Sequence, residues 1–127
     1  MSKIIINSEK APKAIGPYNQ AIVCDNFVFC SGQLPVIPAT GNMIEGGIKE
    51  QTVQVLKNIE AVLSEVNLKL ESVIQTTVYL ADMADFSSFN EIFGEFFSKS
   101  KPTRTTVAVK ALPKNSLIEI TAVAYKE

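Results

Sequence analysis

The sequence predicts an α+β fold in which two helices cover one face of a single sheet. The 127 residues suit one domain with a proper core, so residues 1–127 are interpreted as a single domain. Hydrophobic periodicity predicts the order strand-strand-strand-helix-strand-helix-strand-strand. Two helices can cover only one face of such a sheet. The other face is therefore predicted to pack against a partner subunit.

The first part of the chain is predicted to contain three strands. Residues 3–7 form the first strand, and a loop rich in turn residues follows it. Residues 20–24 and 27–31 are predicted to pair as a tight hairpin, because the turn formers Asp25 and Asn26 separate them. Residues 33–47 contain two prolines and three glycines, and this indicates a long loop of the kind that often carries function.

The middle of the chain alternates helix, strand and helix. Residues 48–66 have apolar side chains at helical spacing, which predicts an amphipathic helix. The β-branched run of residues 73–80 predicts a central strand. Residues 86–97 hold five of the seven phenylalanines at helical spacing, with Ser87 or Ser88 expected to cap the start. We interpret this phenylalanine face as core that packs on the sheet, in preference to an aromatic ligand site.

The last two predicted strands each carry one unusual charge, Arg104 and Glu119. Alternation places Arg104 on one face with Thr106, and Glu119 on one face with Thr121 and Val123. Both charges suit a solvated sheet face as well as a site. In a simple hairpin the two side chains would lie roughly 17 Å apart along the strands. Either the two strands are not neighbours, or another subunit completes a shared site.

Composition excludes several classes of function. The chain has no histidine and only two cysteines, Cys24 and Cys30, so no metal site is expected. The cysteines are expected to be reduced and buried in adjacent strands. A net charge of −1 argues against binding of nucleic acid. No apolar run reaches the roughly 18 residues of a membrane span, so a cytoplasmic protein with no membrane partner is expected.

Several motifs, in this order along the chain, resemble the RidA/YjgF family of enamine/imine deaminases. They are Gly16-Pro17-Tyr18-Asn19-Gln20-Ala21, Phe29-Cys30-Ser31-Gly32-Gln33-Leu34-Pro35, Gln51-Thr52, Val55-Leu56-Lys57-Asn58-Ile59, Phe89-Asn90 and Pro102-Thr103-Arg104. The resemblance spans practically the whole chain. It implies a chorismate-mutase-like fold and a homotrimer. In that trimer the sheets form a central β-barrel, the helices lie outside, and clefts lie between the subunits.

The resemblance also implies a reaction that needs no cofactor. Members hydrolyse 2-imino acids such as 2-iminopropanoate and 2-iminobutanoate to 2-keto acids and ammonia, and so protect pyridoxal-phosphate enzymes from 2-aminoacrylate. Arg104 suits the role of binding the substrate carboxylate, because its planar fork of donors matches a carboxylate. Glu119 matches the glutamate of the family, and we expect it to orient or deprotonate the attacking water.

The remaining expected site residues also come from the resemblance. Tyr18 would close the cleft, Gly32 would let the backbone approach the ligand, and Asn90 would hydrogen-bond nearby. Many members have a cysteine where this chain has Thr106, whose hydroxyl lies on the face of Arg104. Each of these residues also has an ordinary structural interpretation. The main alternative function is a non-catalytic module that binds 2-keto acids, and the ribonuclease activity described for some members is not expected here.

Overall fold

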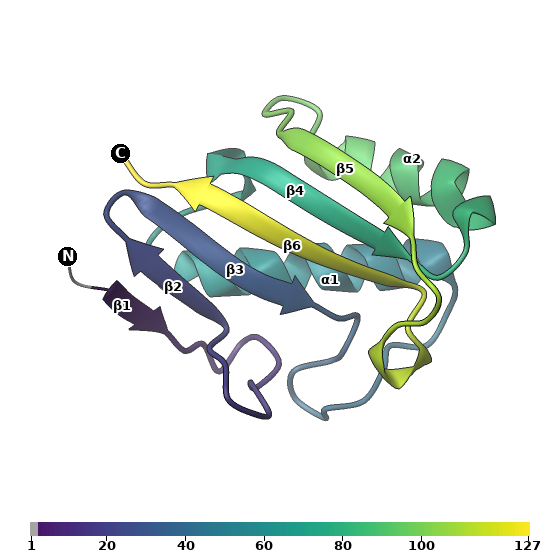
Figure 1. Cartoon of the computed structure of the whole chain (residues 1–127), viewed down its shortest axis with the longest axis horizontal. Helices are drawn as coiled ribbons and strands as arrows, with labels where there is room; N and C mark the ends of the chain where they lie inside the picture. The colour runs from purple at the N-terminus through teal and green to yellow at the C-terminus, as the bar shows by residue number, and fades with distance from the viewer. Residues whose placement is uncertain (1–2) are drawn as a thin grey trace.

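The computed structural model describes residues 3–127, which form one mixed sheet with two long helices on a single face (Figure 1). The strand order is β1-β2-β3-β6-β4-β5. All pairings are antiparallel except that of β4 with β5, which is parallel. The strands are β1 Lys3–Ile6, β2 Ala21–Cys24, β3 Phe27–Gln33, β4 Val73–Leu80, β5 Thr103–Ala108 and β6 Ile118–Tyr125. The predicted α+β class and element order are confirmed.

The β2–β3 hairpin forms at the predicted turn, but β3 is longer than predicted. Cys24 pairs with Phe27, and Asp25 has the positive φ of 53° that a tight turn requires. The register of β3 against β6 shifts between Cys30 and Gln33, so this part of the strand is irregular. The glycine at position 32, which favours a strand end in the sequence, lies inside this irregular segment.

Helix α1 spans Ile48–Ser64 and buries its apolar side against the sheet. Its start is stabilised by Glu50, whose carboxylate accepts a hydrogen bond from the Gly47 N–H at 2.8 Å. The buried apolar residues of α1 are Val55, Leu56, Ile59, Val62 and Leu63.

Helix α2 spans Phe86–Phe96, and its start differs from the prediction. A short 3₁₀ turn, Met83–Asp85, leads directly into the helix, so Asp85 occupies the N-cap position. Ser87 and Ser88 therefore lie inside α2, and the predicted serine cap is wrong. The phenylalanine face is core as predicted, since Phe89 is fully buried and its neighbours pack along it.

The two faces of the sheet differ in what covers them. Alternate residues of β6 are buried on the helix side, and the residues between them, including Glu119, are half-buried on the other side. We call the side away from α1 and α2 the outer face. Several large apolar or aromatic residues of this face are exposed in the single chain, namely Phe27, Phe29, Val107 and Tyr125.

The cysteines lie on neighbouring strands, as predicted. Cys30 of β3 is buried, and burial raises the pKa of its thiol to about 12. Cys24 of β2 is half-buried, and no disulfide joins these two residues. Within residues 3–127, no helix is both long enough and apolar enough to cross a membrane.

Candidate active site

Arg104 lies on β5, the edge strand, and its side chain extends over the helix face of the sheet. In the strand register Arg104 pairs with Thr76 of β4, and Thr76 pairs with Ala122, which is buried under the helices. The guanidinium Nη1 donates a hydrogen bond to Oδ1 of Asn90 on α2 at 2.7 Å. The structure therefore brings together two of the predicted site residues.

The guanidinium of Arg104 also rests on aromatic rings. Its central carbon lies 4.9 Å from the ring centroid of Phe93, 5.4 Å from that of Phe89 and 5.5 Å from that of Phe86. These are cation–π distances. Among residues 3–127 the one salt bridge joins Lys49 to Glu91, so no described carboxylate neutralises Arg104.

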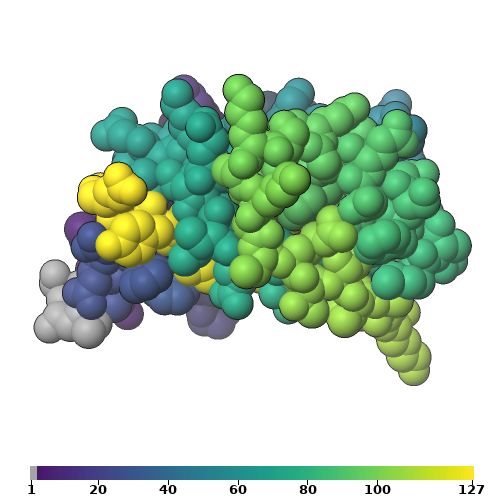
Figure 2. Space-filling model, turned by 90° about the horizontal axis from the view of Figure 1, so that it is seen from above, coloured from purple at the N-terminus to yellow at the C-terminus, as the bar shows by residue number. Residues whose placement is uncertain are grey.

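Open space lies beside this arginine. A cavity of about 630 Å³ is bounded by Arg104, Asn90 and Lys101, among others. Thr106 lies two residues further along β5 on the same face, but its hydroxyl oxygen is buried and has no hydrogen-bond partner among the described residues. Figure 2 views the molecule from above, and the green atoms of α2 and β5 form much of the surface seen in that view. Thr106 does not line the cavity, so we call Arg104 and Asn90 the clamp half-site.

Glu119 lies on β6 in the centre of the sheet and on the outer face. It pairs with Tyr79 of β4, and its side chain is half-buried. Burial raises the pKa of this carboxyl, because removal from water disfavours the charged form. The neighbouring Gly32 provides the space: a Cβ on Gly32 would lie 2.9 Å from Cδ of Glu119 and still closer to Oε2.

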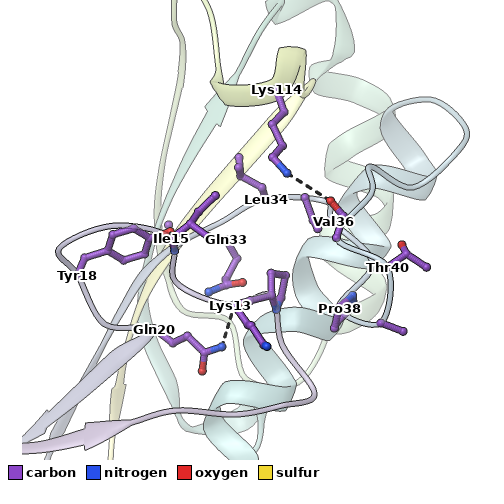
Figure 3. A pocket seen from close by; sticks show the side chains of 14 residues that line it. Lys13, Ile15, Tyr18, Gln20, Gln33, Leu34, Val36, Pro38, Thr40 and Lys114 are labelled. Carbon is purple, nitrogen blue, oxygen red and sulfur yellow. Dashed lines mark hydrogen bonds between the residues drawn. The ribbon is translucent and has the colours of Figure 1, made fainter.

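A second cavity opens next to Gly32, with a volume of about 420 Å³ (Figure 3). Tyr18 and Gly32 both contribute to its walls, together with Lys13 and Lys114 from separate loops. Tyr18 is exposed, and its hydroxyl lies 3.4 Å from the backbone nitrogen of Ile15. Glu119 does not line this cavity but lies against Gly32, which does. We call Glu119, Gly32 and Tyr18 the carboxylate half-site.

Two buried amides that the sequence analysis missed hold the walls of this cavity. Gln20 accepts a hydrogen bond from the Ser8 N–H at 2.6 Å and donates to the Pro12 carbonyl at 2.8 Å, so it fixes the loop that carries Tyr18. Asn58 of α1 donates to the carbonyls of Leu34 and Val36 at 3.0 and 2.9 Å. Asn58 had a signal in the sequence, because it lies at helical spacing from Val55 and Val62 on the apolar side of the helix. Gln20 had no such signal.

Within one chain the two half-sites stay apart. Strands β5 and β6 are not neighbours, because β4 lies between them, and this confirms one of the two geometric alternatives. Arg104 lies on the helix face and Glu119 on the outer face. Through Thr76, Arg104 is level with Ala122 of β6, and Glu119 lies three residues from Ala122. Three residues span about 10 Å along a strand. A small ligand therefore cannot contact both side chains of one chain.

Comparison with known proteins shows the family. The family model described as Endoribonuclease L-PSP matches residues 8–126. The chain is 52% identical over 127 residues to a RutC family protein of Pyrococcus abyssi, with 100% of each chain covered. It is 43% identical over 122 residues to the 2-iminobutanoate/2-iminopropanoate deaminase of Homo sapiens, which covers 96% of this chain and 89% of that protein.

A solved structure agrees with these sequence matches. The structure of E. coli TdcF with bound serine superposes with a TM-score of 0.92 at 37% identity, and covers 98% of this chain and 99% of that one. The chain belongs to the RidA/YjgF/RutC family. The resemblance predicted from the motifs is thus confirmed.

Proposed function

We propose that the protein is an enamine/imine deaminase that hydrolyses 2-imino acids, such as 2-iminopropanoate and 2-iminobutanoate, to 2-keto acids and ammonia. The identity of 43% to the human deaminase supports this activity. The observation that carries the proposal is Glu119, a half-buried carboxylate with a raised pKa. A pKa closer to neutral suits a group that must accept and return a proton, whereas a module that only binds carboxylates needs no such group.

Substrate binding begins with the arginine. One Nη of Arg104 is held by Asn90, which leaves other N–H groups of the guanidinium to bind the substrate carboxylate. The charge of Arg104 has no described counter-ion, so an incoming carboxylate displaces none. The substrate is thereby oriented with its imine carbon next to the carboxylate half-site of a neighbouring subunit.

Hydrolysis then requires one water, both of whose protons finally reach the nitrogen. Glu119 accepts the first proton as the water oxygen bonds to the electrophilic imine carbon, and passes it to the imine nitrogen, so Glu119 is ionised again. The hydroxyl of the resulting carbinolamine gives the second proton to the nitrogen, the C–N bond breaks as the C=O bond forms, and the 2-keto acid and ammonia leave. Tyr18 closes the cleft and offers its hydroxyl to the water or the substrate, and no cofactor takes part. Removal of these imines, and of 2-aminoacrylate as the enamine precursor of 2-iminopropanoate, would protect pyridoxal-phosphate enzymes.

The active assembly in this proposal is a homotrimer. Two features of the chain support it: exposed aromatic residues such as Phe27 and Phe29 on the outer face, and two half-sites that one chain keeps apart. A central barrel built from three outer faces would bury these rings. Because β5 is an edge strand, the contact between subunits at this edge would let Arg104 of one subunit face Glu119 of the next. Sedimentation velocity at micromolar concentration should give the mass of a trimer, and a monomer mass would contradict the shared site.

The activity is tested with a coupled assay. A pyridoxal-phosphate dehydratase generates 2-iminobutanoate from threonine, and the release of 2-ketobutyrate is followed with and without the protein. We expect faster release with the protein, and the same rate after treatment with a chelator. Binding of 2-ketobutyrate without any acceleration would favour the non-catalytic binding module. Serine bound to the related TdcF is compatible with either outcome.

The negative net charge and the absence of histidine give no support to a nuclease activity.

A further inference from the structure

We infer that the phenylalanine row of α2 holds the guanidinium of Arg104 in its binding position and thereby sets the affinity for the substrate carboxylate. Phe86, Phe89 and Phe93 are positioning residues in this inference, which rests on the proposed role of Arg104. The sequence pattern explains the row only as core. The structure adds a second task, because three rings of this row lie within 5.5 Å of a charged side chain.

The row is continuous and faces the edge strand. The ring centroids of Phe86 and Phe89 are 6.0 Å apart, and those of Phe89 and Phe93 are 5.4 Å apart, with tilted or edge-on planes. Phe89 and Phe93 are buried and Phe86 is half-buried, so these rings have little freedom to move. All three lie within 5.5 Å of the guanidinium carbon of Arg104.

Aromatic rings suit this task better than a carboxylate. A carboxylate partner would hold the arginine but would also occupy its donors and compete with the substrate. Ring faces attract the cation through their quadrupole and accept no in-plane hydrogen bond, so the N–H groups stay available. A hydrogen bond from Nη1 to Oδ1 of Asn90, 2.7 Å long, fixes the rotation of the guanidinium. Rings and amide together keep an arginine ordered without neutralising it.

The test compares two phenylalanines of α2, of which one contacts the arginine and the other does not. Phe86 and Phe96 are both half-buried on α2, and only Phe86 contacts Arg104. Affinity for 2-ketobutyrate is measured by calorimetry in Phe86→Leu, Phe86→Tyr and Phe96→Leu, with the melting temperature of each variant. We expect Phe86→Leu to bind about 3- to 30-fold more weakly, in line with the loss of one cation–π contact. Phe86→Tyr keeps the ring and should bind within about twofold of the unmodified protein, and so should Phe96→Leu.

Other outcomes separate this inference from the proposed function. If Phe96→Leu weakens binding as much as Phe86→Leu, or if Phe86→Leu leaves the affinity unchanged, the rings do not position the arginine. If Phe86→Tyr binds as weakly as Phe86→Leu, the ring face is not the cause. Arg104→Ala is the reference: unchanged affinity in that variant overturns the clamp itself. A loss in Arg104→Ala with no loss in Phe86→Leu overturns only the inference about the phenylalanines.

Discussion

The two half-sites carry opposite charges, and their surroundings act on those charges in opposite ways. In the clamp half-site, Arg104 lies on an edge strand, is exposed, and rests on aromatic rings that leave its charge unneutralised. In the carboxylate half-site, Glu119 lies on a central strand with neighbours on both sides, and partial burial makes its charged form less stable. In the proposed mechanism, binding and proton transfer therefore belong to different regions of the chain. Each region can therefore be disturbed separately.

The largest effect is expected from Glu119→Gln. This change keeps the size of the side chain but removes the proton acceptor, so turnover should fall on the order of 10²–10⁴-fold. Affinity for 2-ketobutyrate should change little, because the clamp half-site is untouched. The coupled assay and calorimetry measure the two quantities. Equal turnover in both proteins, with the assay shown to respond to another deaminase, would remove the base role and favour the binding module.

A substitution at Gly32 should disturb the same half-site indirectly. In Gly32→Ala the new methyl would collide with the end of the Glu119 side chain, which is flexible enough to move away. We expect the fold to persist and turnover to fall about 10²-fold, because a displacement of about 1 Å can cost that much. Gly47→Ala at the start of α1 is the matched control, since a methyl there lies 3.9 Å from the Glu50 carboxylate and Gly47 lines neither of the two cavities. Similar turnover in Gly32→Ala and Gly47→Ala would show that the position of Glu119 is not critical.

Arg104→Lys tests the other half-site and should have a smaller effect. The positive charge stays but the planar fork is lost, so 2-ketobutyrate should bind more weakly by about 1–3 kcal/mol. The loss should appear in affinity and in kcat/KM, while the mass of the assembly stays the same. Unchanged affinity in Arg104→Lys and in Arg104→Ala would show that the carboxylate binds elsewhere.

The smallest effect concerns pH. Turnover should fall on acidification with a midpoint above the pKa of about 4.3 of an ordinary glutamate, because burial raises the pKa of Glu119. The raised pKa also makes the stability of the fold depend on pH. A raised pKa in the folded state contributes stability below the unfolded pKa, and this is lost as pH rises through the folded pKa. Thermal unfolding of Glu119→Gln should therefore show a gain over the unmodified protein at pH 8 relative to pH 4. An identical difference at both pH values would contradict the shift.

Much of the fold could be predicted because local pattern and tertiary packing agree. The apolar spacing in α1 and the β-branched run of β4 define their elements within two residues. The exceptions are places where neighbours in space decide. The start of α2 depends on the 3₁₀ turn before it, and the extension of β3 through Gly32 depends on pairing with β6.

For the candidate site, too, some features could be predicted from the sequence and others could not. The sequence alone determined which residue types the site contains. Arg104 and Glu119 are charges on predicted strands, and Asn90 is an amide within the phenylalanine pattern; their chemistry and the family motifs point to them without a structure. Only the tertiary structure decided that Arg104 meets Asn90 and three rings, and that Glu119 fills the space that Gly32 leaves. Strand order and register together caused this separation: β4 lies between β5 and β6, and the pairings of Arg104 with Thr76 and of Glu119 with Tyr79 put the two side chains on opposite faces. Sequence periodicity records which face of its own strand a residue shares, but not which strands become neighbours.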